Sequence, residues 1–468
     1  MRDTSQKILL VESHYRSRSW FRALESLGDI SVVSVMPEER KLFLALGVDE
    51  KNILNLNNFY CDDIRVDEAS SYLAWAEKTF GFCYAEIVQM DRTLREKPRN
   101  YILSYGCYVL REFSKFVEGK DIRLVVIEPT WVHEILIVHV CKFLGIRLLA
   151  PVKEKLLPNR FFLFRGFTRE IPFYRSESKS GVLMGRQLVN IVLADHRPQY
   201  FKKFEQRNKF RISKVVPLLD FTRLSLFNLK NPNIQPKYFR FLRRKFKDIV
   251  LGYYLRWRVA FINPNKLRMP FILVTMHVQP EAGIDVVGAR FSNQYEFIRQ
   301  ISRTTPAGYR VVVKEHPHDF GRRDRLFYSK LIELGNVVLV SPDIDSRELI
   351  KRSSLVLSVA GTSSLEASIL GTPAVTAVPM YFHRLLVRKF FDPYVDSVAE
   401  LLIESEKWKS GFNLDLQIRI LDEILGDSFV GNCMDLKTDS RVLDKKNIGH
   451  LRDAFQEVLL SSLTPNSP

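Results

Sequence analysis

The chain has 468 residues, of which 46% are hydrophobic and 26% charged, and its formal net charge is +17. This length exceeds one ordinary hydrophobic core and the composition is globular, so two α/β domains are expected. No apolar run approaches the ~18 residues that span a bilayer, and the five cysteines contain no C-x-x-C pair, which argues against a disulfide framework and a zinc site.

The first half of the chain alternates short apolar runs with helical patterns. Residues 7–11 predict a strand, and the loop ESHYRSRS follows it. An apolar strand at 123–127 ends at Glu128 and Pro129. The other predicted elements are helices at 18–27, 70–90, 101–117 and 131–144 and strands at 30–35 and 146–150. This order is typical of a doubly wound domain.

The positive charge is concentrated in residues 197–268, where 19 Lys or Arg stand against three acids, a balance of +16. Fourteen aromatic residues are interleaved with these charges, more than a purely solvated connector carries. The mixture suits an anionic membrane surface or an acidic glycan, and no nucleic-acid module accompanies it. The N-terminal apolar run is too short for a secretory signal. We therefore expect a cytoplasmic protein, peripheral at the inner membrane.

The second half repeats the alternation more regularly. Its strands are uniformly apolar, which indicates a parallel sheet covered on both faces. The predicted strands are 271–277, 310–314, 337–340, 355–359 and 374–378, and the predicted helices are 293–301, 324–334, 346–352 and 365–370. The sequence therefore predicts an α/β protein of two Rossmann-like, doubly wound domains: 1–265 including the basic segment, 266–435, and a C-terminal helix and tail at 436–468.

Polar residues follow three strands of the second domain, where ligands of doubly wound sheets bind. Gly361, Thr362, Ser363 and Ser364 open a helix, so their amides and hydroxyls can bind a phosphate. The alternative is N-capping, with Glu366 completing a capping box.

His316 precedes Pro317, which biases the histidine to an extended conformation and directs its ring out of the strand end. There the imidazole can donate to a diphosphate or a leaving phosphate, and a satisfied core histidine is the alternative. His318 can share the role or lie in an exposed loop.

The strings VVVKEHPHDFG and LVLSVAGTSSLEASILGTPAV resemble the donor half of HP-motif GT-B glycosyltransferases, most closely the bacterial capsule polysaccharide biosynthesis group that includes β-Kdo transferases. HVQPEAG, FGFCYAEIVQMDRTL, IEPTWVHE and SFVGNC are similar to the same group. The resemblance implies two domains facing an interdomain crevice, a nucleotide-sugar donor, CMP-linked in some members, and no catalytic metal. It covers the basic segment least.

The resemblance also implies residue roles. His316, Thr362, Ser363 and Ser364 would contact the donor phosphate, and Glu366 matches a position that binds the ribose in many GT-B enzymes. Helix capping is the alternative for Glu366. Gln279 and Glu281, in the strand-end motif HVQPEAG, are assigned to the donor site, with an exposed turn carboxylate as the alternative for Glu281.

The candidate catalytic residues of the first domain are carboxylates. Glu128 ends an apolar strand, where burial would raise its pKa toward that of a useful general acid or base; a strand terminator is the alternative. Asp91 with Arg92 is either an active-site pair or a surface pair at a helix end. His14, Arg16 and Arg18 either bind an acidic sugar or are solvated.

The function expected is transfer of a sugar, such as Kdo or a related acidic sugar, from a nucleotide-sugar donor onto a bacterial surface polysaccharide or glycolipid. A CDP-polyol or glycerol phosphotransferase of the same fold is the first alternative. A nucleotide-sugar epimerase and a non-catalytic, basic membrane-associated assembly protein are further alternatives. No cofactor or metal is expected.

Overall fold

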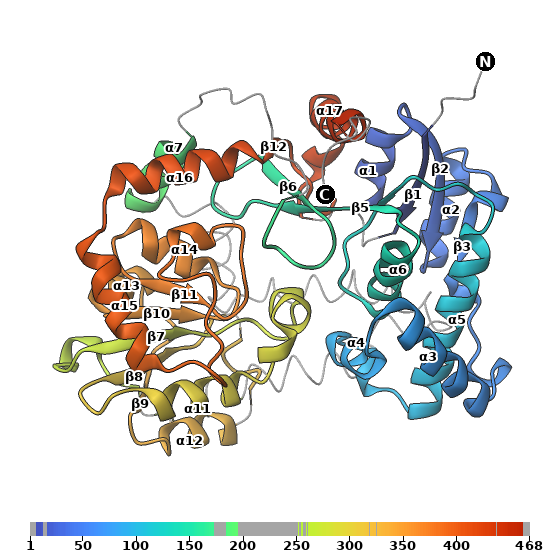
Figure 1. Cartoon of the computed structure of the whole chain (residues 1–468). Helices are drawn as coiled ribbons and strands as arrows, with labels where there is room; N and C mark the ends of the chain where they lie inside the picture. Colours follow the sequence, from blue (N-terminus) through green and yellow to red (C-terminus); the bar gives the residue numbers. More distant parts are fainter. Residues whose placement is uncertain are drawn as a thin grey trace. The chain divides into compact units, whose positions relative to one another are not determined.

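The computed structural model describes residues 6–12, 16–172, 184–194, 251, 254–255, 259, 261–317, 319–323, 325–436 and 438–461. Most of the basic segment 197–268 lies outside the described residues, as do His14 and His318. The chain forms two compact units. The N-terminal unit comprises Met1–Ser180 and Gly426–Pro468, and the C-terminal unit comprises Gly181–Leu425 (Figure 1).

The N-terminal unit is built on a seven-stranded sheet in the order β12-β6-β5-β4-β1-β2-β3. The five strands from β3 to β5 run parallel, whereas β6 is antiparallel to β5 and β12 is antiparallel to β6. The strands are β1 (Gln6–Val11), β2 (Gly28–Ser34), β3 (Ile53–Asn55), β4 (Leu124–Val126), β5 (Arg147–Lys153), β6 (Arg160–Phe164) and β12 (Phe429–Val430).

The helices of this unit pack on that sheet and on one another (Figure 1). They are α1 (Ser17–Leu24), α2 (Pro37–Ala45), α3 (Val66–Phe80), α4 (Tyr84–Met90), α5 (Arg99–Val117), α6 (Val132–Phe143) and α17 (Lys445–Ser461). One buried cluster combines Ile8 and Leu10 of β1 with Trp20 of α1 and Phe455 of α17. The C-terminal helix therefore completes the core of the N-terminal unit.

The C-terminal unit is built on a fully parallel five-stranded sheet in the order β11-β10-β7-β8-β9. Its strands are β7 (Phe271–Thr275), β8 (Arg310–Lys314), β9 (Val337–Val340), β10 (Leu355–Ser358) and β11 (Ala374–Thr376). Its helices are α7 (Met184–Leu193), α11 (Gln294–Thr304), α12 (Arg325–Ile332), α13 (Ser346–Arg352), α14 (Thr362–Ile369), α15 (Val398–Ser410) and α16 (Leu414–Gly426).

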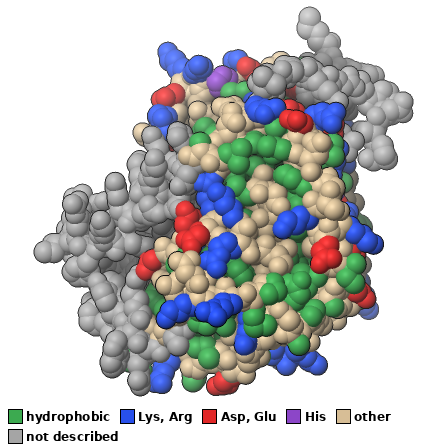
Figure 2. Space-filling model, turned by 90° about the vertical axis from the view of Figure 1, so that its left-hand side faces the viewer, with side chains coloured by type: hydrophobic (Ala, Val, Ile, Leu, Met, Phe, Trp, Pro, Cys, Tyr) green, Lys and Arg blue, Asp and Glu red, His purple; other side chains and the backbone are tan. Residues whose placement is uncertain are grey.

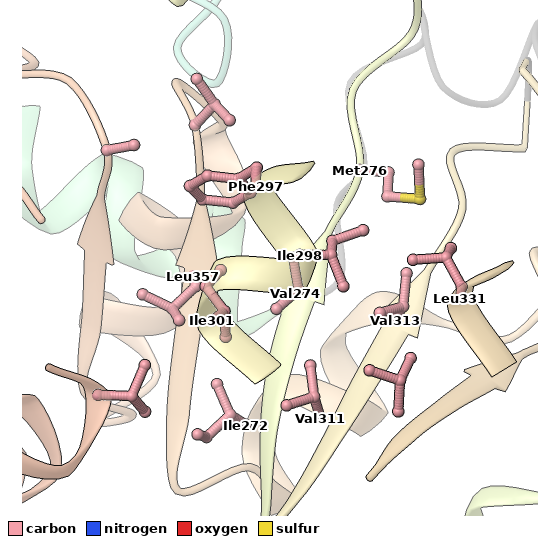
Figure 3. Close-up of a cluster of buried hydrophobic side chains, with 14 of the residues drawn as sticks. Ile272, Val274, Met276, Phe297, Ile298, Ile301, Val311, Val313, Leu331 and Leu357 are labelled. Atoms are coloured by element: carbon pink, nitrogen blue, oxygen red, sulfur yellow. The ribbon is translucent and has the colours of Figure 1, made fainter. Parts of the chain in front are cut away.

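Branched aliphatic side chains fill the space between this sheet and its helices. Ile272, Val274, Val311 and Val313 project from β7 and β8 against Ile298 of α11 (Figure 3), and all are buried. Because both faces of the sheet are covered, its strands show the uniform apolar pattern read in the sequence. The predicted α/β class with two Rossmann-like domains is confirmed.

The division of the structure differs from the predicted boundary at residues 265 and 266. Helix α7 belongs to the C-terminal unit, where the Gly185 amide donates to Asp422 at 2.6 Å. A Cβ on Gly185 would lie 2.4 Å from the carbonyl oxygen of Ile418, so the close approach of α7 and α16 requires glycine. At the other end, residues 426–468 return to the N-terminal unit through β12 and α17.

Two predicted helices are corrected. The single helix expected at 70–90 is two helices, α3 and α4, because Gly81 ends α3 in the left-handed conformation with φ 68°. The helix expected at 365–370 begins earlier, at Thr362, so the hydroxyl residues form its first turn.

The surface of the described residues carries hydrophobic, polar and charged side chains side by side. On the face drawn in Figure 2, hydrophobic side chains form small groups among polar ones, and Lys and Arg are more frequent than Asp and Glu. Within the described part of the chain, no helix combines the length and the apolar character needed to cross a bilayer.

Candidate functional site

Each sheet has one position where the strand order reverses. In the C-terminal unit, β8 and β9 lie on one side of β7, whereas β10 and β11 lie on the other. In the N-terminal unit, β2 and β3 lie on one side of β1, whereas β4 and β5 lie on the other. Ligands of doubly wound sheets bind at the carboxyl ends of strands beside such a reversal. A ligand is therefore expected at these two sheet edges.

Two hydrogen bonds join the strand ends across the reversal in the C-terminal unit. The amide of Ala360, just after β10, donates to Nε2 of His277, just after β7, at 3.1 Å. The hydroxyls of Thr275 and Ser363 lie 2.6 Å apart. Because Nε2 of His277 accepts, the proton of the neutral ring is assigned to Nδ1. These bonds fix the start of α14 beside the end of β7.

The first turn of α14 has unpaired donors. Its N-cap is Gly361, which has no side chain to cap the helix. Among the described residues, the amides of Thr362 and Ser363 and the Thr362 hydroxyl have no hydrogen-bond partner. The capping-box interpretation therefore fails, because a capping box needs a hydroxyl at the N-cap. The positive end of the helix dipole and these donors can receive an anion.

The hydroxyl of Ser364 points inward instead. Ser364 is fully buried, and its Oγ lies 2.8 Å from Oγ of Ser358 and donates to the Val375 carbonyl at 3.1 Å. Its side chain thus holds the β10–α14 turn together, which is a structural use. Glu366 lies half-buried further along α14. Of the four predicted phosphate contacts in residues 361–364, the donors of Thr362 and Ser363 are the ones placed for a ligand.

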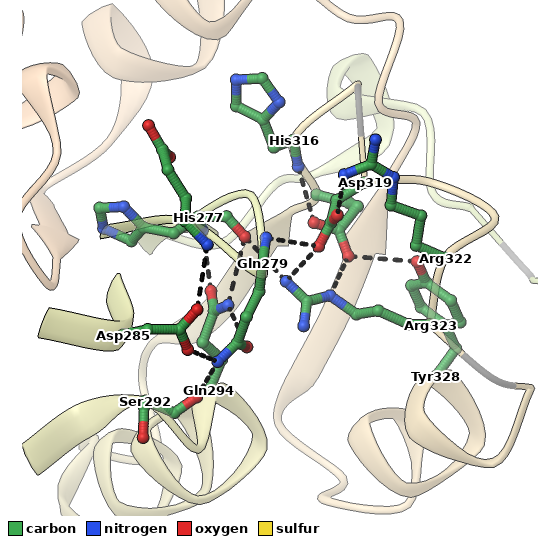
Figure 4. Close-up of polar contacts among 12 residues, drawn as sticks. His277, Gln279, Asp285, Ser292, Gln294, His316, Asp319, Arg322, Arg323 and Tyr328 are labelled. Carbon is green, nitrogen blue, oxygen red and sulfur yellow. Dashed lines mark hydrogen bonds and ion pairs between the residues drawn. The ribbon is translucent and has the colours of Figure 1, made fainter. Parts of the chain in front are cut away.

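His316 lies two residues after the end of β8, the strand on the other side of β7. Its amide donates to Oε1 of Glu315 at 2.8 Å, and its carbonyl accepts from the Asp319 amide at 2.9 Å. The ring is half-buried, and in Figure 4 it points away from the ion pairs beneath it. The strand ends therefore bring His316, His277 and the start of α14 to one edge of the sheet.

The ion pairs beneath His316 are centred on Arg323. Its guanidinium contacts Oε2 of Glu315 at 2.7 Å and Oδ2 of Asp319 at 2.9 Å, and it donates to the His277 carbonyl at 2.8 Å (Figure 4). Burial raises the pKa of Asp319 to about 6; Arg323 opposes this shift and Glu315 adds to it. Sequence reasoning missed this cluster, although the charged run after His316 in KEHPHDFGRR was its signal.

The two residues predicted from the HVQPEAG motif differ in their surroundings. The side-chain amide of Gln279 donates to Asp285 at 2.8 Å and to the Ser292 carbonyl at 3.0 Å, and its oxygen accepts from Gln294 at 3.1 Å. Gln279 is thereby committed to holding the loop after β7. Glu281 is exposed, which agrees with the turn-carboxylate alternative and leaves its side chain accessible at the same loop.

In the N-terminal unit, Glu128 follows β4 at the strand reversal and forms an ion pair with Arg16. The Arg16 and Glu128 side chains are 28% and 21% exposed. Burial lowers the pKa of Arg16, but the interactions with Glu128, Cys433 and Asp435 together outweigh this effect, so the pKa is raised. Glu128 is thus a partly exposed, ion-paired carboxylate at the strand reversal, and its catalytic role stays a prediction.

Asp91 is 4% exposed and serves the backbone. Its Oδ1 accepts from the amides of Thr93 and Leu94, each at 2.8 Å, and its Oδ2 accepts from the amide of Val132 at 3.0 Å. Arg92 lies over the Trp131 ring at 3.9 Å. With both carboxylate oxygens holding backbone amides, Asp91 has a structural use, and neither predicted alternative describes it.

Glu134, which sequence reasoning did not single out, also accepts hydrogen bonds from backbone amides at the start of α6. Its Oε2 accepts from the amides of Thr130 at 2.6 Å and Trp131 at 3.0 Å. Burial raises the pKa of Glu134 to about 8; the Thr130 and Trp131 amides oppose that rise and Glu128 adds to it. The start of α6 thus receives two carboxylates from the protein itself.

No group of three or more His, Cys, Asp or Glu side chains capable of holding a metal occurs among the described residues.

The family model "Protein of unknown function (DUF354)" matches residues 322–417. No curated protein matches the sequence. The family match includes Arg323 and the start of α14, and it begins after His316.

Among solved structures, the chain is similar to UDP-GlcNAc 2-epimerase from Neisseria meningitidis bound to UDP-GlcNAc, at 14% identity over 97% of this chain and 100% of that one, with a TM-score of 0.24. It is also similar to KpsC, a beta Kdo 2,7 transferase of Thermosulfurimonas dismutans, at 12% identity over 75% and 89% of the two chains, with a TM-score of 0.32. The N-terminal domain of Candida albicans trehalose-6-phosphate phosphatase is similar at 11% identity over 99% and 98%, with a TM-score of 0.32.

Proposed function

We propose that this chain is a GT-B-type glycosyltransferase whose C-terminal unit binds a nucleotide-sugar donor. The sugar, Kdo or a related acidic sugar, would be transferred onto a bacterial surface polysaccharide or glycolipid. One observation carries the proposal: the uncapped first turn of α14 lies at the strand reversal with His277, next to the strand end that carries His316.

In this proposal the donor phosphate accepts from the amides of Thr362 and Ser363 and from the Thr362 hydroxyl. A positive helix terminus with free donors favours an anion. His316 would donate to the phosphate that leaves with the nucleotide, neutralising charge as the glycosidic bond breaks. A nucleoside monophosphate and a diphosphate share this chemistry, so the nucleotide is left to experiment.

The N-terminal unit would supply the catalytic carboxylate. Glu128 lies at its strand reversal and is partly exposed, so it is the proposed general base or nucleophile toward the acceptor or the sugar. Arg16 neutralises its charge and would also attract an acidic sugar. Contact of the basic segment 197–268 with an anionic membrane stays a prediction from the sequence.

Isothermal titration with CMP, CDP, UDP and GDP tests the donor site. One nucleotide should bind the wild-type protein, and H316A and the double variant T362A/S363A should each weaken its binding about 10- to 100-fold, the loss expected for charge-assisted hydrogen bonds. H450A and S71A/T79A, which change matched side chains in the N-terminal unit, should bind as the wild type does. Wild-type affinity in both site variants would overturn the assignment.

A further inference from the structure

The buried ion-pair cluster beneath His316 is built to hold that residue. The Arg323 side chain is 11% exposed, and its carboxylate partners Glu315 and Asp319 are 3% and 1% exposed. Tyr328 adds a hydrogen bond from its hydroxyl to Oε2 of Glu315 at 3.1 Å. Charges this deeply buried are costly unless they are paired and hydrogen-bonded, so the cluster keeps a defined geometry.

The cluster contacts the backbone of His316 from both sides. Glu315, held by Arg323, accepts from the His316 amide at 2.8 Å. Asp319, also held by Arg323, donates its own amide to the His316 carbonyl at 2.9 Å. One guanidinium therefore fixes the residues on either side of the histidine.

The same guanidinium joins two strand ends. Through the His277 carbonyl it contacts the loop after β7, and through Glu315 it contacts the loop after β8. His277 in turn accepts from the Ala360 amide at the start of the β10–α14 turn. Arg323 thus links the residues that flank His316 to the loop after β7 (Figure 4), and His277 of that loop contacts the turn that leads into α14.

We propose that Arg323 is a positioning residue that holds the imidazole of His316 where it meets the donor phosphate, an inference that rests on the proposed function. Arginine suits this task because its planar fork serves several acceptors at once. A lysine at the same position carries the charge on a single nitrogen at the end of a flexible stem, so it does not reproduce the fixed geometry in which Nε contacts Glu315 and Nη2 contacts Asp319 and the His277 carbonyl.

A double-mutant cycle between Arg323 and His316 tests the proposal, with the nucleotide that binds the wild-type protein as the probe. R323K retains the buried positive charge. If Arg323 served only to balance the charge of its carboxylate partners, R323K would bind the nucleotide as the wild type does. We expect R323K to weaken nucleotide binding about tenfold in the wild-type background and less than about twofold in the H316A background, because coupled residues are not additive. R299K, which alters the partly exposed Arg299–Glu296 ion pair on α11, is the matched control.

Y328F keeps the ion pairs and loses only one hydrogen bond to Glu315. It therefore provides a second test of the proposal if R323K does not fold. It should weaken binding in the same background-dependent way, by a smaller factor. Equal weakening of binding in both backgrounds, or none in the wild-type background, would overturn the positioning role while the donor site stands. Wild-type affinity in H316A would overturn the positioning role, and only wild-type affinity in both H316A and T362A/S363A would overturn the proposed function as well.

Discussion

The first turns of α6 and α14 occupy equivalent places in the two units, since each helix follows the strand beside the reversal. At α6 the protein supplies its own acceptors: the carboxyl group of Glu134 accepts from the amides of Thr130 and Trp131, and Asp91 accepts from the amide of Val132. At α14 the N-cap is glycine, and the amides of Thr362 and Ser363 have no partner among the described residues. The comparison shows which helix terminus is closed and which can receive a ligand.

The two edges also differ in the charges that they present. The N-terminal edge carries the Arg16–Glu128 ion pair beside the closed helix terminus. The C-terminal edge carries His316 and His277 above buried carboxylates that Arg323 neutralises. An accessible carboxylate suits proton transfer or nucleophilic attack, whereas amides, hydroxyls and histidines suit a phosphate. The difference predicts that the two edges have different roles: phosphate binding at the C-terminal edge, and proton transfer or nucleophilic attack at the N-terminal edge.

The largest expected effect comes from Glu128. In E128Q, transfer should fall by about 10²- to 10⁴-fold, because glutamine keeps the shape and loses proton-transfer capacity. Nucleotide affinity, by contrast, should stay near the wild-type value, since the donor is assigned to the other unit. Release of free nucleotide from the nucleotide sugar measures the first quantity and titration the second. E50Q, at the exposed Arg40–Glu50 pair, is the control. Transfer at the wild-type rate in E128Q would assign Glu128 to structure.

A second experiment makes α14 resemble α6. In T362D a protein carboxylate occupies the open helix terminus, so nucleotide binding should weaken at least ~100-fold, because two like charges a few ångströms apart repel by several kcal/mol near a protein surface. The same change should stabilise the fold by about 0.3–1 kcal/mol through the helix dipole. T362N, of the same size and uncharged, should lose far less affinity. Undiminished binding by T362D would show that the phosphate lies elsewhere.

The third prediction concerns the closed helix terminus, that of α6. The pKa of Glu134 is about 8 in the folded protein and 4.5 is its ordinary value, so the folded state holds this proton more tightly. Its stabilising contribution is complete below pH 4.5 and is lost as the pH rises through 8. Wild-type thermal stability should therefore decline between about pH 5 and 8, and E134Q should show a flatter profile. E38Q, an exposed carboxylate in the first turn of α2, should decline as the wild type does. Parallel curves for E134Q and wild type would contradict the raised pKa.

Local pattern was enough to predict most of the fold. Strands β8 and β9 and helix α13 lie where the apolar runs and helical spacing place them, because each pattern reflects burial on a parallel sheet or one face of a helix. The strand-end positions of Glu128, His316 and the start of α14 follow from the same pattern. Strands β3 and β12 were not predicted, since they have three and two residues and show no distinct periodicity; β6, a five-residue strand whose residues after Arg160 are all apolar, was missed although it carries the same pattern as the predicted strands.

Long-range contacts lay beyond the sequence. The return of β12 and α17 to the N-terminal unit pairs residues far apart in the chain, such as Val430 with Arg160, and no local signal records that partner. The structural role of Asp91 likewise depends on its hydrogen bond with the amide of Val132. The structural role of Ser364 depends on its contacts with Ser358 and the Val375 carbonyl.

The sequence by itself determined two Rossmann-like domains and the strand ends at which polar residues gather. Only the tertiary structure decided which of those residues form hydrogen bonds within the protein and which leave donors for a ligand. The physical reason is that a backbone or side-chain group is satisfied by whatever atom packing brings within about 3 Å, and packing joins elements that are distant in the chain.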